Sequence, residues 1–154
     1  MRNESTGPRR STRDTVRAVA LATSLFAVAP SLASAAQVVV RVDGVAVSGG
    51  TVFVSLCSGG LEPQDCSLAQ KVEPVGPVVA ARFADVSPGV YAAAAFQDIT
   101  GSGTLDRSPR GLPREPYGLS REAGRTAAPR FDRAAFVIGA DATVAVHLAM
   151  PGRP

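Results

Sequence analysis

The chain has 154 residues, no Trp, one His, two Cys and a formal net charge of +3 at pH 7. The first 35 residues hold five of the 16 basic residues and two of the 13 acidic ones, so residues 36–154 carry 11 charges of each sign. The excess positive charge therefore belongs to the leading segment and gives no reason to expect nucleic-acid binding. Residues 36–154 have the length of one domain.

The leading segment has the three parts of a secretory signal peptide. Five Arg residues come before or just at the start of an uncharged apolar run at 18–29, and Pro30 and Ala33-Ser34-Ala35 follow it. A basic region, an apolar region and an A-x-A ending are typical of a leader that is cleaved on export. We therefore expect a signal peptide at 1–35 and a periplasmic or extracellular product that does not span the membrane. The alternative is an uncleaved anchor, but Pro30 and Ser34 interrupt the run of about 20 apolar residues that a spanning helix needs.

The first part of the predicted domain reads as strands joined by turns and one disulfide. Two β-branched runs, 37–43 and 51–57, are separated by Gly-containing turns and predict a hairpin. Cys57 and Cys66 bracket a short polar loop, and an even cysteine count in an exported chain predicts a disulfide. The Pro-containing segment 70–77 predicts a crossover or an irregular edge strand.

Four more strands complete the pattern. Residues 78–86 and 90–96 flank a Pro-Gly turn, and the second run contains four consecutive Ala residues. Its weak alternation is typical of a central strand covered on both faces. Residues 132–139 and 142–150 predict a terminal hairpin. Six or seven short strands favour an all-β fold, an antiparallel β-sandwich of about seven strands.

A long polar loop, 98–132, interrupts the strands, and loops of this length are usually functional or disordered. Its opening has the layout of a calcium loop, with oxygen side chains at alternate places and Gly103 at the sixth. The candidate metal ligands are Asp98, Thr100, Ser102, Thr104 and Asp106. Two of these five are carboxylates, and Pro109 stands where a closing Glu is expected, so a calcium ion bound here is held weakly. With so few charged ligands, we favour the other interpretation, a hydrogen-bonded turn without metal in which Asp98 and Asp106 accept bonds from loop amides.

An ordered series of short motifs runs from residue 89 to residue 134. The motifs are Gly89-Val90-Tyr91-Ala92, Asp98…Gly103…Asp106, Gly111-Leu112-Pro113-Arg114-Glu115, Tyr117-Gly118-Leu119-Ser120 and Pro129-Arg130-Phe131-Asp132-Arg133-Ala134. The series resembles a bacterial family of exported small domains of unknown function, which carry D-x-N-x-N-G-x-x-D, G-[IL]-P-x-E and Y-G-[FL]-S. This chain has Thr100 and Ser102 where the family has Asn, and Gln97 where it has His. The resemblance implies an extracytoplasmic sandwich of prealbumin-like or immunoglobulin-like type and no settled activity.

The residue types favour binding over catalysis. His147 is the single histidine, and the chain has no nucleophile elbow, zinc-type His pair or phosphate-cradling loop. We therefore expect a non-catalytic binding or accessory module that acts through loop 98–132. The candidate binding surface consists of Tyr117, Arg107, Arg110, Arg114 and Glu115. The expected partner is an envelope glycan, an anionic envelope component or a protein, and the alternatives are a structural envelope protein or a hydrolase-type enzyme.

Overall fold

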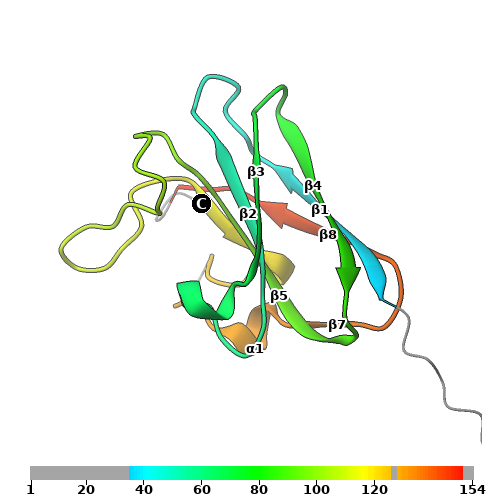
Figure 1. Cartoon of the computed structure of the whole chain (residues 1–154). Helices are drawn as coiled ribbons and strands as arrows, with labels where there is room; N and C mark the ends of the chain where they lie inside the picture. The colour runs from blue at the N-terminus through cyan, green and yellow to red at the C-terminus, as the bar shows by residue number, and fades with distance from the viewer. Residues whose placement is uncertain (1–34, 126–127, 151–154) are drawn as a thin grey trace, which may run out of the picture. The chain divides into compact units, whose positions relative to one another are not determined.

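Two β-sheets packed face to face make up the fold (Figure 1). The computed structural model describes residues 35–125 and 128–150. In chain order the elements are β1 (Ala36–Asp43), β2 (Val52–Cys57), η1 (Pro63–Asp65), β3 (Leu68–Val72), β4 (Val78–Val86), β5 (Gly89–Gln97), β6 (Tyr117–Leu119), η2 (Ser120–Glu122), α1 (Phe131–Ala134), β7 (Phe136–Ile138) and β8 (Ala142–His147). One sheet has the order β4-β1-β8, and the other has the order β3-β2-β5-β6, with β7 also paired to β5. The predicted all-β sandwich is confirmed.

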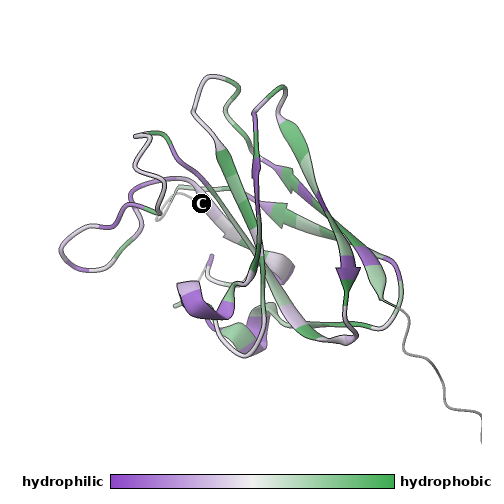
Figure 2. Cartoon of the chain, in the orientation of Figure 1, coloured by the Kyte–Doolittle hydropathy of each residue, from purple (hydrophilic) through white to green (hydrophobic). Residues whose placement is uncertain are grey.

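Alternating side chains on β1 and β2 build the core between the sheets. Val38, Val40 and Val42 of β1 are fully buried, and so is Val52 of β2. Successive side chains of a strand point to opposite faces, so each strand offers one apolar face. Figure 2 shows hydrophobic segments on β1, β2, β4 and β8 and hydrophilic segments in the projecting loop after β5. Each buried Val stabilises the fold by on the order of 1.5 kcal/mol.

Both predicted hairpins are wrong. The first two strands lie in different sheets, because β1 pairs with β4 and β8 while β2 pairs with β3 and β5. The last two strands are also separated, since β7 pairs with β5 and β8 pairs with β1. Strands with one apolar face bury those faces best when they lie opposite each other across a core. The β1–β8 ladder is parallel, so the sandwich is not antiparallel throughout.

The Ala-rich strand β5 is central and covered on both faces, as predicted. Ala93 and Ala95 are buried in the core between the sheets. Ala92, on the opposite face, packs in a second cluster with Leu119 and Ala134. The second cluster shows that the segment after β6 folds back over the outer face of β5, where small side chains permit close approach.

One edge of the sandwich is closed by a side chain. Residues 70–77, predicted as a crossover or an irregular edge strand, contain some of each: the edge strand β3 (Leu68–Val72) pairs with β2, and residues 73–77 lead from it to β4 in the other sheet. The Gln70 side-chain amide donates to the Arg82 carbonyl and accepts from the Arg82 N–H at 3.2 Å. Because Arg82 belongs to β4, the Gln70 side chain forms hydrogen bonds with outward-facing backbone groups at the edge of the other sheet.

The predicted disulfide is also present. Cys57, at the end of β2, is bonded to Cys66 with an S–S distance of 2.05 Å. No helix in the described ranges is long and apolar enough to cross a membrane. The predicted leader falls almost entirely on residues 1–34, which lie outside the described residues.

Candidate functional site

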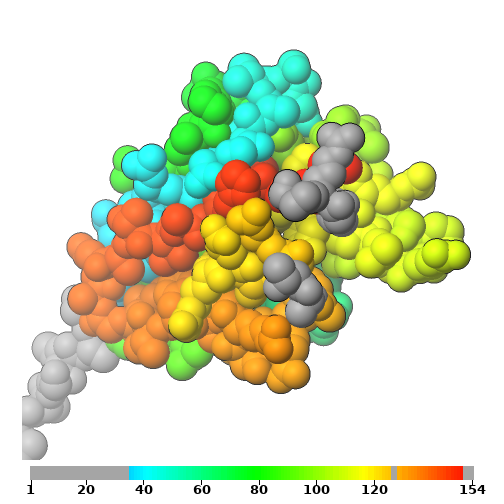
Figure 3. Space-filling view, turned by 180° about the vertical axis from the view of Figure 1, so that it is seen from behind, coloured from blue at the N-terminus to red at the C-terminus, as the bar shows by residue number. Residues whose placement is uncertain are grey.

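The long loop predicted at 98–132 divides into two structural parts. Residues 98–116, which we call the arm, leave the sheet at the end of β5 and return at β6. Figures 1 and 3 show the arm projecting to one side of the sandwich. Residues 117–134 contain β6, η2 and α1, so this second part carries regular structure that the sequence pattern did not predict.

The carboxylate of Asp98 organises the base of the arm. Its Oδ1 accepts hydrogen bonds from the N–H groups of Gly101 at 2.8 Å and Ser102 at 3.1 Å, and its Oδ2 accepts from Gly103 at 2.8 Å. Burial alone raises the pKa of Asp98, but these backbone bonds and the Thr100 hydroxyl outweigh it and hold the pKa below its ordinary value. Gly103 has a φ of 78°, a conformation that glycine adopts without strain.

Glu115 closes the same turn from the other side. The Glu115 side chain is 2 % exposed. Its Oε1 accepts from the N–H of Ile99 at 2.8 Å and that of Thr100 at 3.3 Å, while its Oε2 accepts from the N–H of Asp106 at 3.0 Å. The prediction that Glu115 forms part of a solvent-facing binding surface is wrong, because these backbone donors hold the carboxylate inside. Its role depends on a contact with residues up to 16 positions earlier, which the motif spacing did not reveal.

The predicted calcium ligands are engaged with one another. The Thr100 hydroxyl donates to Asp106 Oδ2 at 2.9 Å, and the Ser102 hydroxyl donates to the Thr104 carbonyl at 2.8 Å. Three backbone N–H groups occupy most of the lone pairs of Asp98 that a calcium ion would need. Residues 35–125 and 128–150 contain no group of three or more His, Cys, Asp or Glu arranged to hold a metal. The donor set therefore fits a hydrogen-bonded turn better than a calcium cage.

The far part of the arm is a small two-stranded ribbon. The N–H of Arg114 donates to the Asp106 carbonyl and the N–H of Ser108 donates to the Leu112 carbonyl, both at 2.8 Å. An antiparallel bridge joins Arg107 to Pro113 between these bonds. The ribbon fixes the path of the backbone at residues 106–114.

Three arginine residues lie on this ribbon. Arg107, Arg110 and Arg114 are exposed, and no ion pair involves them within the described ranges. Arg107 Nη1 donates to the Gly111 carbonyl at 3.1 Å. Leu112, in the same ribbon, is 60 % exposed. The ribbon thus presents cationic groups around an exposed apolar side chain.

Tyr117 lies apart from this ribbon. Its hydroxyl donates to the Gly124 carbonyl at 3.1 Å, and its backbone exchanges two hydrogen bonds of 3.1 Å with Ala149. The half-buried ring therefore holds the segment after β6.

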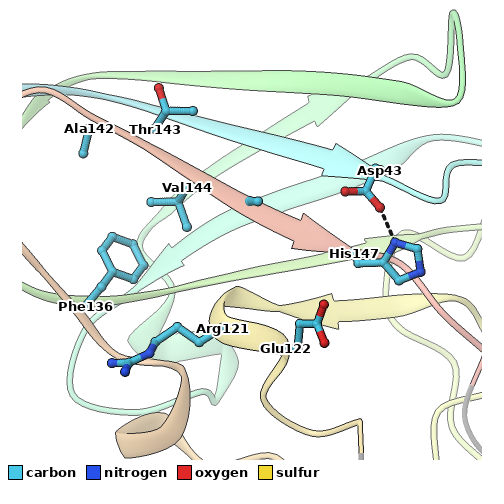
Figure 4. A pocket seen from close by; sticks show the side chains of 9 residues that line it. Asp43, Arg121, Glu122, Phe136, Ala142, Thr143, Val144 and His147 are labelled. Carbon is cyan, nitrogen blue, oxygen red and sulfur yellow. Dashed lines mark hydrogen bonds and ion pairs between the residues drawn. The ribbon is translucent and has the colours of Figure 1, made fainter.

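An open cavity of about 500 Å³, which we call the β8 groove, lies between β8 and η2 (Figure 4). It is lined by Asp43, Arg121, Glu122, Phe136, Ala142, Thr143, Val144, Ala145 and His147. Figure 3 shows the orange-to-red surface of β8 beside the yellow-to-orange surface of residues 120–136. The sequence analysis missed this groove, because its lining comes from four separate segments of the chain.

Backbone strain occurs in the wall of the groove. Arg121 and Glu122 have φ angles of 58° and 54°, in a left-handed region that non-glycine residues rarely occupy. Arg121 Nη1 donates to the Ala135 carbonyl at 2.9 Å, and Glu122 forms an ion pair with Arg125 at 3.0 Å. Strained residues of this kind often cluster at functional sites, so this wall of the groove is a candidate site.

A His–Asp pair lies at one end of the groove. His147 and Asp43 are opposite each other in the β1–β8 ladder, and His147 Nδ1 is hydrogen-bonded to Asp43 Oδ1. The side chain of His147 is 42 % exposed. Within the described ranges, no hydroxyl is hydrogen-bonded to the His147 ring.

Comparison with known proteins gives one match. The model of a family described as an uncharacterised protein conserved in bacteria, DUF2141, matches residues 40–146. No curated protein and no solved structure matches the chain. The family match runs from β1 to β8 and includes the arm and both walls of the β8 groove. The predicted resemblance to a bacterial domain of unknown function is therefore confirmed, and the chain belongs to the DUF2141 family.

Proposed function

We propose that this protein is a non-catalytic binding module of the bacterial envelope whose arm contacts an anionic partner. The observation that carries the proposal is the group of three exposed arginines on the ribbon at 106–114, with no carboxylate paired to them within the described ranges. Guanidinium groups bind carboxylates and phosphates through charge-assisted hydrogen bonds. An anionic glycan or another anionic envelope component has this chemistry.

The architecture of the arm supports binding because the loop is held in shape before a partner arrives. Asp98 and Glu115 accept backbone hydrogen bonds from both halves of the turn below the ribbon. A preorganised loop loses less conformational entropy on binding than a flexible one. Residues 36–154 carry no net charge, so the positive ribbon is a local feature rather than a property of the whole domain.

Export of the protein is part of the same proposal. The Cys57–Cys66 disulfide supports an oxidising compartment, where such bonds persist. The predicted leader and the prealbumin-like or immunoglobulin-like type of sandwich belong to this proposal as well. Intact-mass measurement of the native protein tests export directly: a product that begins at Ala36 supports it, and a product that retains residues 1–35 contradicts it.

Binding to a sulfated polysaccharide tests the arm. Fluorescent dextran sulfate serves as the anionic probe, with neutral dextran as its control. We expect R110Q/R114Q to weaken dextran sulfate binding at least about tenfold. The matched variant R41Q/R82Q removes two exposed arginines from β1 and β4 and should change binding little. Equal losses in both variants would show general charge attraction instead of an arm site.

The His147–Asp43 pair favours a second candidate, a hydrolase-type enzyme. A carboxylate that orients a histidine is one part of a general-base arrangement. Screening of ester, amide and phosphodiester substrates addresses this candidate, with H147Q as the control. Turnover that is present in the parent protein and lost in H147Q would replace the non-catalytic proposal.

A further inference from the structure

We propose that the tip of the arm inserts into the surface of an anionic lipid bilayer, with Leu112 below the headgroups and the arginines of the ribbon at the headgroup phosphates. The inference rests on the proposed function, because it names an anionic lipid surface as the partner of the arm. The contact is peripheral, since the tip enters the interface of the bilayer and the β-sandwich stays outside it.

The tip is a tight turn held by backbone hydrogen bonds. The N–H of Gly111 donates to the Ser108 carbonyl at 2.8 Å, and Gly111 has a φ of 78°. The N–H of Ser108 donates to the Leu112 carbonyl at 2.8 Å, so residues 109–111 form a three-residue hairpin loop that ends in a left-handed glycine. Leu112 comes directly after this loop and therefore lies at the outer end of the ribbon.

The exposed side chain of Leu112 shares the tip with three guanidinium groups. Leu112 and Arg114 are two residues apart on one strand of the ribbon, and successive side chains of a strand alternate between its faces, so these two share a face. Arg110 lies in the turn itself. Arg107 Nη1 donates to the Gly111 carbonyl at 3.1 Å, which brings this guanidinium to the turn as well.

The charges of the arm are separated between its base and its tip. Residues 98–116 contain three acidic and three basic residues, so the arm as a whole has no net charge. The carboxylates of Asp98 and Glu115 are buried, and that of Asp106 accepts hydrogen bonds from two hydroxyl groups of the turn below the ribbon. The acidic groups are thus bonded at the base, whereas the three arginines lie on the ribbon. The positive charge is therefore concentrated at the tip.

An aliphatic side chain among arginines favours a bilayer over a polysaccharide. A sulfated or carboxylated glycan binds guanidinium groups, but it offers no apolar layer that would remove Leu112 from water. The interface of a bilayer offers both, because its phosphates lie outside and its acyl chains begin about 5–10 Å below them. The arm projects from the sandwich, as Figure 3 shows, so its tip reaches a flat surface before the β-sheets do.

Sedimentation with lipid vesicles tests the proposal. Vesicles of phosphatidylglycerol and phosphatidylcholine in equal parts provide the anionic surface, and vesicles of phosphatidylcholine alone are the neutral control. The native protein and its variants are prepared with the same N-terminus, so that differences between them report the arm. We expect the parent protein to bind the anionic vesicles and not the neutral ones.

Three variants separate the apolar contact from the charged one. Leu112→Ser should bind the anionic vesicles at least about tenfold more weakly but bind dextran sulfate as the parent does. R110Q/R114Q should weaken the binding of both probes at least about tenfold. The matched control Val137→Ser removes an aliphatic side chain that is 78 % exposed on β7, which pairs with the end of β5 opposite the arm. It should bind both probes as the parent does.

A tryptophan at the tip reports insertion directly. The chain contains no Trp, so Leu112→Trp and Val137→Trp each carry a single indole. We expect the emission of Leu112→Trp to shift to shorter wavelength with anionic vesicles and to be quenched by brominated acyl chains. Dextran sulfate and neutral vesicles should cause no shift, and the emission of Val137→Trp should stay unchanged with all probes.

The outcomes distinguish this inference from the proposed function. Binding of the parent to dextran sulfate but not to anionic vesicles would overturn the lipid assignment and leave the proposed function standing. Binding to neither probe would contradict both. Equal vesicle binding by Leu112→Ser and the parent, or an equal emission shift of Leu112→Trp with dextran sulfate, would show that the tip does not insert. Binding to envelope membranes that contain protein, but not to lipid vesicles, would make an envelope protein the partner instead.

Discussion

The arm and the β8 groove differ in where their backbone hydrogen bonds go. In the arm, backbone N–H groups between Ile99 and Asp106 donate hydrogen bonds to two buried carboxylates, those of Asp98 and Glu115. In the groove, no strand of the described part of the chain pairs with the outward backbone groups of Thr143 and Ala145. The arm forms hydrogen bonds to its own backbone groups and exposes side chains. The groove exposes backbone groups. The two regions therefore differ in what they expose: charged side chains on the arm and backbone groups in the groove.

Loss of Glu115 should break the arm and give the largest effect. Glu115→Ala leaves several buried N–H groups without an acceptor, and we expect the free energy of unfolding to fall by about 3 kcal/mol. Urea denaturation measures this change, and hydrogen exchange should show faster exchange at residues 99–106 but not along β8. Glu122→Ala, which removes an exposed ion-pair partner, should cost no more than about 0.5 kcal/mol. Equal effects of the two substitutions would contradict the organising role of Glu115.

Gly118→Ala should disturb the groove while it spares the arm. The added methyl group would lie 2.1 Å from the His147 carbonyl oxygen and 2.9 Å from Val146 Cγ1, so β6 and β8 must move apart. We expect a loss of about 2 kcal/mol, as for other overpacked sites. Gly139→Ala is the matched control because a Cβ there meets no atom within 4 Å. Unchanged stability and unchanged β8 amide shifts in Gly118→Ala would show that the close contact does not define the groove.

The lowered pKa of Asp98 predicts a pH dependence that belongs to the arm. A carboxylate whose pKa is lower in the folded than in the unfolded state stabilises the fold at pH above its ordinary value of 3.8. That contribution is lost as the pH falls from about 4 through the folded pKa. Urea denaturation of the parent protein and of Asp98→Asn across this range should show a stability difference that shrinks with acidification. Asp132, whose pKa the Arg130 guanidinium also lowers, is common to both proteins and cancels in the difference.

An alternating exchange pattern along β8 is the subtlest prediction. The amides of Val144 and Val146 face β1, whereas those of Thr143 and Ala145 face the open edge. We expect faster hydrogen exchange at Thr143 and Ala145 than at Val144 and Val146. Residue-resolved exchange by NMR measures the difference. Uniform protection along the strand in the free protein would mean that its edge is already covered.

Local sequence features located most of the strands, but they missed β6, and residues 132–134 of the strand predicted at 132–139 belong to α1 instead. Alternation in 37–43 and the Pro-Gly break before 90–96 both mark segments that the structure contains as strands. The Ala run predicted a strand covered on both faces, which Ala92 and Ala93 confirm by packing in separate clusters. The spacing and compartment argument also predicted the Cys57–Cys66 disulfide. These properties depend on side chains that are close together in the sequence.

Strand pairing and both candidate sites depended on the tertiary structure. The patterns of β1 and β2 show which face is apolar, but they do not distinguish a neighbour in the same sheet from a strand across the core. The charge of Glu115 predicts an exposed side chain. The carboxylate is buried because backbone N–H groups of the turn in the arm donate hydrogen bonds to it. The β8 groove needs Asp43, Arg121 and Phe136 beside one strand. The local sequence pattern determines which residues form strands and which face of each strand is apolar. Contacts between distant segments decide which backbone groups are hydrogen-bonded and which are not.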